Sequence, residues 1–191
     1  MDYRFFALIS RMRYIDRWAL MRNTTRENIQ EHSHMVAVLA HALALIQKRY
    51  YGGATDPGQV ALAALYHDAT EIITGDMPTP IKYYNPAIKD AYKEVEAVAQ
   101  DKLLSMLPPE LVPAYEPLVR ESDGAVRRYV KAADKLAAWL KCQEELKAGN
   151  SEFRRAADET MAALRDMGME EVDWFMERLG HAFTLTLDDL G

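Results

Sequence analysis

Apolar residues recur at helical spacing along almost the whole of this 191-residue chain, and that periodicity limits the possible folds more than any other feature. Residues three and four positions apart line one face of an α-helix, whereas a half-buried strand alternates apolar and polar residues. Few runs in the sequence alternate in that way. We therefore predict an all-α fold. The clearest stripe lies in the segment Glu31–Tyr50 and consists of His32, Met35, Val36, Leu39, Leu43 and Ile46.

Glycines and prolines divide the chain into helices and loops. We expect a loop over Asp16–Arg26, which is rich in Arg, Asn and Thr, and a stiff, nonhelical loop over Asp76–Pro80, where two prolines restrict the backbone. A further helical segment, Pro109–Glu121, is interrupted by Pro113 and Pro117. The predicted helices are Tyr3–Arg13, Glu31–Tyr50, Pro57–Ile73, Pro86–Met106, Ala125–Ala148, Ser151–Met167 and Glu170–Leu179, with a tail at Thr184–Gly191.

Composition and charge are those of one ordinary globular domain: 49% of the residues are hydrophobic and 27% are charged. No apolar stretch reaches the roughly 20 residues that cross a bilayer, and the N-terminus lacks the pattern of a secretory signal, so we expect a cytoplasmic protein that does not enter a membrane. The net charge of −6 disfavours binding to a nucleic-acid polymer. The single cysteine, Cys142, suits a buried thiol better than a metal ligand.

The segment Tyr66–Glu71 places two potential metal ligands, His67 and Asp68, side by side. If a helix continues through them, Glu71 lies one turn away and near both. The apolar run Val60–Leu65 indicates that this helix buries its body and presents its end to a cavity, where a divalent cation would stabilise the carboxylates. Taken alone, a His-Asp pair on a solvated helix end is the more common explanation.

A second histidine shares the face of the predicted core stripe. At roughly 100° per residue, His32 points with the stripe, whereas His34 and His41 project about half a turn away and suit surface positions. Alone, His32 also fits a histidine at the edge of the core. The His67–Asp68 pair makes a metal ligand the better interpretation.

Asp134 lies at the edge of another apolar stripe, about 40° from Val130. Its simplest partner is Lys131, three residues earlier. Together with His32, His67 and Asp68, however, it completes a set of two imidazoles and two carboxylates. Such a set suits Mn²⁺, Co²⁺, Fe²⁺, Zn²⁺ or Mg²⁺, and without a thiolate nothing selects sharply for zinc.

The order of these ligands resembles the H…HD…D motif of the HD-domain metal-dependent phosphohydrolases. A closer resemblance, to the bacterial HD-domain 5′-deoxynucleotidases, runs along nearly the whole chain. It implies one HD domain over residues 1–191, with a metal core at about 28–145 and helices 151–180 packed on it. Its motifs are Arg17-Trp18, Leu20-Met21-Arg22-Asn23, Glu27-Asn28, Glu31-His32-Ser33, Tyr66-His67-Asp68-Ala69, Glu71, Thr74-Gly75-Asp76, Pro78-Thr79-Pro80, Leu140-Lys141-Cys142, Glu144-Glu145-Leu146 and Leu185–Asp188.

By this resemblance the chain is a homodimeric enzyme that cleaves deoxyribonucleoside 5′-monophosphates to deoxynucleoside and phosphate, with one divalent metal ion. Glu71 and Asp76 would be catalytic, one acting on the water and the other on the leaving 5′-oxygen, in either order. Arg17 would bind the phosphate, and Trp18 would exclude a 2′-hydroxyl. The expected substrate-binding set is Arg17, Trp18, His32, Asp68, Asp76, Met77, Pro78 and Thr79.

Other functions remain compatible with the same residues. Nucleoside triphosphohydrolases, cyclic-nucleotide phosphodiesterases and alarmone hydrolases use similar ligands. A regulator that binds nucleotides without turnover, or a helical interaction module, would belong to another class. Glu71 and Asp76 beside the ligands disfavour both of these non-enzymatic alternatives.

Overall fold

The computed structural model describes residues 2–82, 84–120 and 124–191, and within them the regular structure is helical, as predicted. Strand-like pairing in these residues is limited to an isolated antiparallel bridge between Asp16 and Asn28. The elements are α1 (Phe5–Ile9), η1 (Ser10–Tyr14), α2 (Ile29–Tyr50), α3 (Pro57–Tyr66), α4 (Glu71–Thr74), α5 (Thr79–Lys82), α6 (Pro86–Leu104), α7 (Val112–Val119), α8 (Gly124–Lys147), η2 (Ser151–Phe153), α9 (Arg154–Arg165), α10 (Glu170–Arg178), η3 (Gly180–Thr184) and α11 (Leu187–Leu190).

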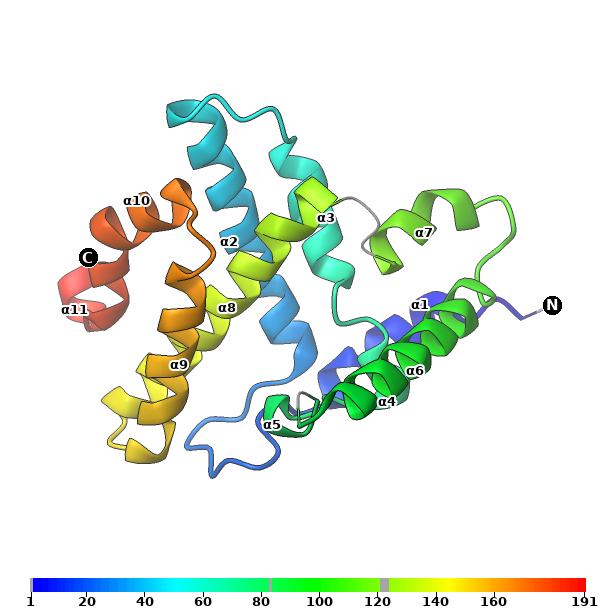
Figure 1. The fold of residues 1–191 in the computed structure, drawn as a ribbon, viewed down its shortest axis with the longest axis horizontal. Helices are drawn as coiled ribbons and strands as arrows, with labels where there is room; N and C mark the ends of the chain where they lie inside the picture. Colours follow the sequence, from blue (N-terminus) through cyan, green and yellow to red (C-terminus); the bar gives the residue numbers. More distant parts are fainter. Residues whose placement is uncertain (1, 83, 121–123) are drawn as a thin grey trace.

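Three helices, α2, α3 and α8, form the centre of the molecule, with α8 running across the other two (Figure 1). The side chain of Asn28 caps α2 by accepting hydrogen bonds from the backbone of Gln30 and Glu31. The predicted stripe of α2 is buried, except that Met35 is 39% exposed because it lies at the edge of that face. The central core contains Val36, Leu39, Leu43, Val60, Ala64, Val130, Ala133 and Leu136.

A second, smaller core lies under the other end of α3. It joins α1, α6 and α7 through Phe5, Leu103, Leu107 and Val119, together with Ala69 from the turn after α3. The backbone N–H groups of the chain's first residues pair here too, since Arg4 donates to the carbonyl of Met106. The turn that follows α3 is therefore anchored in this second core by Ala69.

The C-terminal helices pack on the central layer, α9 along α8 and α10 against α2 (Figure 1). Beyond them, the prediction of a tail at Thr184–Gly191 is wrong, because α11 occupies Leu187–Leu190. A capping box forms this short helix: Thr186 and Asp189 exchange side-chain and backbone hydrogen bonds.

Several predicted boundaries differ from the structure. The first helix is shorter and continues as the tighter η1, and the segment predicted as Ser151–Met167 begins as η2. The prediction that Asp76–Pro80 contains no helix is wrong at its end, since α5 starts at Thr79, and a proline in a first helical turn loses no hydrogen bond. Residue Glu121, the predicted end of the Pro109–Glu121 segment, lies outside the described residues.

None of the helices in the described residues combines the length and the apolar character that a membrane span requires.

Candidate metal centre

Side chains from three parts of the chain meet where α2, α3 and α8 pack together. His32 comes from α2 and is fully buried, His67 and Asp68 lie in the turn after α3, and Asp134 lies in the middle of α8. The Nε2 atom of His32 is 3.0 Å from Oδ1 of Asp134 and 3.7 Å from Oδ2 of Asp68. The Nε2 atom of His67 is 3.1 Å from the same Asp68 oxygen. These four residues, the His-Asp cluster, are the four that the sequence predicted as metal ligands.

The turn after α3 explains how His67 and Asp68 reach the cluster. The prediction of one helix over Pro57–Ile73 is wrong: α3 ends at Tyr66, and the N–H groups of His67 and Glu71 then bond to carbonyls three residues earlier, at 3.4 and 3.0 Å. Such bonds tighten the backbone relative to an α-helix. The chain resumes as α4, which stops at Gly75 with φ of +75°.

The same turn fixes the orientation of the His67 ring. Its Nδ1 atom lies 2.7 Å from the carbonyl oxygen of Ala64, one turn earlier, and donates a hydrogen bond to it. In the neutral ring, the form that binds a metal, the Nε2 atom is thereby left with a lone pair that faces the cluster. A backbone carbonyl on the far nitrogen is the usual support of a metal-binding histidine.

The electrostatics of the cluster favour positive charge at its centre. Burial opposes ionisation of Asp68, but the neighbouring His67, His32 and Arg17 outweigh burial and hold the pKa of Asp68 well below its usual range. For Asp134, burial is likewise outweighed, chiefly by His32, and the pKa falls to about 2. Burial of His67 is outweighed mainly by the charge of Asp68, which raises the histidine pKa to about 9. Both carboxylates thus stay ionised and attract a cation.

The donor atoms also fit a metal ion. One ligand atom from each of His32, His67 and Asp68 lies within 4.8 Å of the others, and Asp134 adjoins His32. The Nε2 atom of His67 is buried and makes no hydrogen bond of good geometry, even though Asp68 is close. A buried polar atom without a partner is unfavourable unless a ligand satisfies it. Two nitrogens and two carboxylates suit a divalent ion.

Arg17 approaches the cluster from the loop before α2. The Nη1 atom of Arg17 is 3.3 Å from Oδ2 of Asp68, and its Nε atom is 3.1 Å from Oε2 of Glu27. Burial lowers the pKa of Arg17, but Asp68, Asp134 and Glu27 outweigh burial and raise it. The predicted phosphate-binding arginine therefore stands beside the predicted metal ligands, permanently charged.

Trp18 lies beside Arg17 in an unusual backbone conformation. Its φ of +60° is the only positive value for a residue other than glycine among the described residues. The indole Nε1 donates to Oε2 of Glu27 at 3.0 Å, and the ring packs against Phe153 at a centroid distance of 5.3 Å. Because a bulky side chain disfavours this conformation, tertiary contacts must hold it.

The two predicted catalytic carboxylates lie within the electrostatic influence of the cluster. Burial, reinforced by Asp68 and Asp76, raises the pKa of Glu71 to about 9. Burial also raises the pKa of Asp76, which Arg17 and a hydrogen bond from the backbone of Trp18 partly offset. The Oε2 atom of Glu71 is buried and unpartnered. Of the neighbouring residues, Met77 and Pro78 are half-buried and Thr79 is exposed at the start of α5.

Sequence reasoning missed the partners of Arg17 and Trp18. Glu27 was only part of a motif, and Phe153 was not singled out, although both contact Trp18. No spacing rule relates a loop residue to a carboxylate ten positions later or to a ring in η2. The signal that could have found Glu27 is a carboxylate in an otherwise basic loop.

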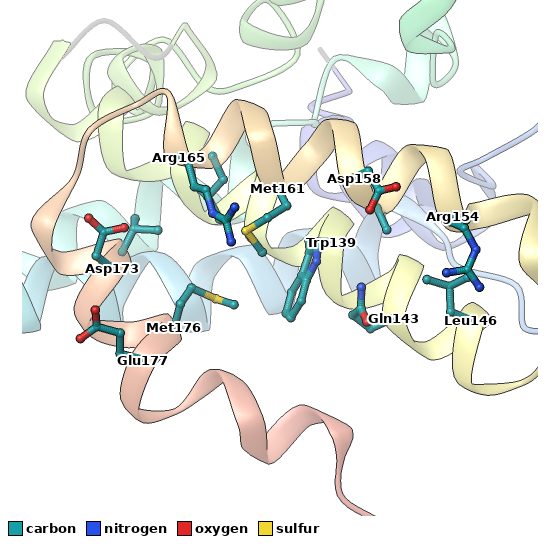
Figure 2. A pocket seen from close by; sticks show the side chains of 13 residues that line it. Trp139, Gln143, Leu146, Arg154, Asp158, Met161, Arg165, Asp173, Met176 and Glu177 are labelled. Atoms are coloured by element: carbon teal, nitrogen blue, oxygen red, sulfur yellow. The ribbon is translucent and has the colours of Figure 1, made fainter.

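A cavity of about 580 Å³ lies elsewhere, between α8, α9 and α10. Figure 2 shows Trp139 from α8, Met161 and Arg165 from α9, and Met176 from α10 around this space. None of the predicted site residues lines it. The candidate site is therefore defined by the His-Asp cluster and not by this cavity.

Comparison with known proteins identifies the family. Residues 4–183 match the model of the family described as 5′-deoxynucleotidase YfbR-like. The chain belongs to the YfbR-like 5′-deoxynucleotidase family. A 5′-deoxynucleotidase from Erwinia tasmaniensis is 50% identical over 97% of this chain and 95% of its own length. The 5′-deoxynucleotidase YfbR from Escherichia coli O1:K1 / APEC is 47% identical over 97% of this chain and 94% of its own length.

Solved structures of HD-domain phosphohydrolases share the fold. An HD-domain phosphohydrolase from Listeria innocua superimposes with a TM-score of 0.81 at 21% identity, covering 94% of this chain and 88% of that one. The HD phosphohydrolase of cyanophage S-2L, bound to dA and one catalytic Zn²⁺ ion, superimposes with a TM-score of 0.66 at 22% identity. The match covers 94% of this chain and 96% of that one. These likenesses establish the all-α HD-domain architecture.

Proposed function

We propose that this YfbR-like chain is a metal-dependent phosphomonoesterase that hydrolyses deoxyribonucleoside 5′-monophosphates to deoxynucleoside and inorganic phosphate. Relatives named 5′-deoxynucleotidase match it at about half identity along nearly the whole chain. The observation that carries the proposal is the His-Asp cluster, in which the buried Nε2 of His67 is unpartnered and Arg17 stands 3.3 Å from Asp68. A cation site beside a buried arginine suits a phosphate monoester.

One divalent metal ion would be held by His32, His67, Asp68 and Asp134. When bound, it supplies Lewis acidity toward the phosphate and lowers the pKa of a coordinated water. The mixed nitrogen and oxygen donors suit Co²⁺, Mn²⁺, Zn²⁺, Fe²⁺ and Mg²⁺ alike. Oδ2 of Asp68 lies 3.3 Å from Nη1 of Arg17 and 3.7 Å from Nε2 of His32, so His32 and Asp68 would also form part of the phosphate pocket.

Glu71 and Asp76 divide the proton chemistry between them in this proposal. Both carboxyl groups have raised pKa values, chiefly because of burial. The negative charge of Asp68 raises each pKa further. One of them orients and deprotonates the attacking water, and the other protonates the departing 5′-oxygen.

Arg17 and the segment around Trp18 hold the nucleotide. The guanidinium of Arg17 offers a planar pair of donors to the phosphate, which a lysine would not match. Trp18 would lie against the deoxyribose and leave no room for a 2′-hydroxyl. Met77, Pro78 and Thr79 would contact the nucleoside through shape and backbone, which accounts for tolerance of different bases.

We also propose that the working unit is a cytoplasmic homodimer. The outer face of α2 supports association, since Val38 is 51% and Leu45 is 49% exposed on a helix that carries no Asp, Glu, Lys or Arg between Glu31 and Lys48. Light scattering at several protein concentrations tests the dimer directly.

The test of function is phosphate release from matched ribo- and deoxyribonucleoside 5′-monophosphates across Co²⁺, Mn²⁺, Zn²⁺, Fe²⁺ and Mg²⁺, with chelator-treated protein as the blank. We expect inorganic phosphate from every deoxy substrate, a much lower rate on each ribo counterpart, and no release after chelation. Triphosphate from deoxynucleoside triphosphates, or cleavage of cyclic nucleotides alone, would instead assign the chain to another activity of the HD group.

A further inference from the structure

The loop that carries Arg17 and Trp18 is closed at its base. Asp16 and Asn28 form the antiparallel bridge, the N–H of Arg17 donates to the carbonyl of Glu27 at 2.9 Å, and Ile29 donates to Ile15 at 3.0 Å. Backbone pairing of this kind brings residues far apart in sequence directly opposite each other. Glu27 is thereby fixed beside Arg17, ten positions earlier.

One oxygen of Glu27 holds both functional side chains of this loop. Its Oε2 atom accepts from Nε of Arg17 at 3.1 Å and from Nε1 of Trp18 at 3.0 Å. The side chains of Arg17 and Glu27 are only 12% and 16% exposed, so water competes weakly for these bonds. Glu27 makes no contact with the His-Asp cluster among the hydrogen bonds and ion pairs of the described residues.

This arrangement determines what each partner presents to the site. Because Glu27 occupies Nε of Arg17, the Nη edge of the guanidinium is turned toward Asp68, where Nη1 lies at 3.3 Å. Trp18 is held in a left-handed backbone conformation, with Glu27 at its Nε1 and Phe153 against its ring. Without the Glu27 bond, a bulky residue at positive φ has a strong tendency to relax.

We propose that Glu27 is a positioning residue that sets the phosphate-binding arginine and the sugar-facing tryptophan together, so that phosphate affinity and rejection of the 2′-hydroxyl depend on one carboxylate. The inference rests on the proposed function of the site. It differs from a simple ion pair, which would neutralise Arg17 and leave the selectivity of Trp18 untouched.

Two substitutions separate the two bonds. Glu27→Ala removes the acceptor for both partners. Glu27→Gln keeps an oxygen of the same reach, so the indole N–H still has an acceptor, but it removes the negative charge that holds Arg17. Glu152→Ala is the matched control, because Glu152 accepts from the backbone of Arg22 in the same loop and touches neither Arg17 nor Trp18.

Each protein is assayed with the native metal content verified, on a deoxyribonucleoside monophosphate and its ribo counterpart, with inorganic phosphate as a competitive probe. In Glu27→Ala we expect KM and the inhibition constant of phosphate to rise about tenfold, and the preference for the deoxy substrate in kcat/KM to fall at least about tenfold. Glu27→Gln should weaken the binding of phosphate while keeping the preference for the deoxy substrate within about threefold of the wild type. Glu152→Ala should change neither phosphate binding nor this preference.

A preference in Glu27→Ala equal to that of the wild type, with only KM raised, would reduce Glu27 to an ion-pair partner and overturn the proposal. Equal losses of kcat/KM on the deoxy and ribo substrates, in Glu27→Gln as in Glu27→Ala, would also overturn it, because the preference would then not depend on Glu27. If the wild type itself releases no phosphate from deoxynucleotides, the proposed function fails, whereas an active and selective wild type with indifferent variants refutes only the role of Glu27.

Discussion

Two groups of charged side chains share α8, and they differ in how completely their atoms are bonded. The first is the His-Asp cluster, to which α8 contributes Asp134. The second is the pair of Lys141 and Glu145, two to three turns farther along, whose side chains are 3% and 1% exposed. Both groups remove charge from water, which is costly unless partners compensate for it.

The pair at the far end of α8 is fully compensated. Glu145 accepts hydrogen bonds from the backbone and hydroxyl of Thr24, from the backbone of Thr25 and from Asn150, and it pairs with Lys141. Lys141 also donates to the carbonyl of Thr25. These bonds tie the tip of the Arg17–Glu27 loop to α8.

The His-Asp cluster lacks this saturation. Nδ1 of His32, Nε2 of His67 and the adjacent Oε2 of Glu71 are all buried without a hydrogen-bond partner. The two charged groups that share α8 thus differ in how far the protein itself satisfies their polar atoms. A charged group whose hydrogen bonds are all satisfied stabilises the fold. A group with unsatisfied polar atoms lowers the stability of the fold until a bound ligand satisfies those atoms.

The largest effect should follow from Asp68→Asn. Asp68 lies within 3.7 Å of His32, His67 and Arg17, so loss of its charge removes the common partner of the cluster. We expect bound metal to be lost and phosphate release to fall at least about a thousandfold, with metal measured by atomic emission. His34→Ala, an exposed histidine two residues from His32 on α2, is the control and should keep both properties.

Glu71→Gln should separate catalysis from metal binding. The substitution keeps the size of the side chain but removes its titrating proton. We expect metal content like that of the wild type and a fall in kcat of about 100-fold to 1,000-fold. Single-turnover measurements show whether chemistry is the slowed step. Wild-type turnover in this variant would transfer the proton chemistry to Asp76 alone.

Glu145→Gln tests the saturated pair and should act on stability instead. It leaves the buried Lys141 without its counter-charge, and we expect the free energy of unfolding to fall by about 3 kcal/mol, measured by urea denaturation at neutral pH. In the folded protein, metal content should stay unchanged. Glu159→Gln is the matched control, since the side chains of the Arg155–Glu159 pair have the same spacing but are 88% and 63% exposed. This control should lower the free energy of unfolding by less than about 0.5 kcal/mol. Equal losses in the two variants would contradict the comparison.

Much of the fold followed from periodicity alone. The stripe in Glu31–Tyr50 predicted a helix that the structure contains as α2, because such a signal is local. The break after Tyr66 was missed, since the residues that follow have no helix-breaking signal and the turn is stabilised by the Ala64 carbonyl on His67 and by the second core. α11 was missed because a capping box of one turn has too short an apolar pattern to detect.

For the site too, the residues with local sequence signals were predicted and those that depend on tertiary contacts were not. His32, His67, Asp68 and Asp134 were predicted because each carries its chemistry on a helix face or in a recognisable motif, and the structure brings all four together. The double role of Glu27 and the saturation of Glu145 depend on pairings over 9 and 121 positions of sequence. Those pairings follow from tertiary packing, which single-sequence periodicity does not encode.

Acid titration should give the smallest effect and sharpen the comparison further. Burial alone would raise the pKa of Glu145, but Lys141, Asn150 and Thr24 outweigh it and hold that pKa well below its usual range. A depressed pKa in the folded state contributes stability that is complete above the unfolded-state value of about 4.3, decreases below that value and is fully lost only as the pH falls through the folded-state pKa.

Glu145→Gln lacks this titration, and the other carboxylates are common to both proteins. The difference in free energy of unfolding between wild type and variant should therefore narrow by about 1 kcal/mol between pH 6 and about pH 3.5, with urea denaturation at each pH as the measurement. A difference that stays constant or widens on acidification would mean that Glu145 titrates no lower in the folded state than in the unfolded chain. The saturation seen around it would then contribute through hydrogen bonding alone, and the contrast with the His-Asp cluster would no longer be one of charge.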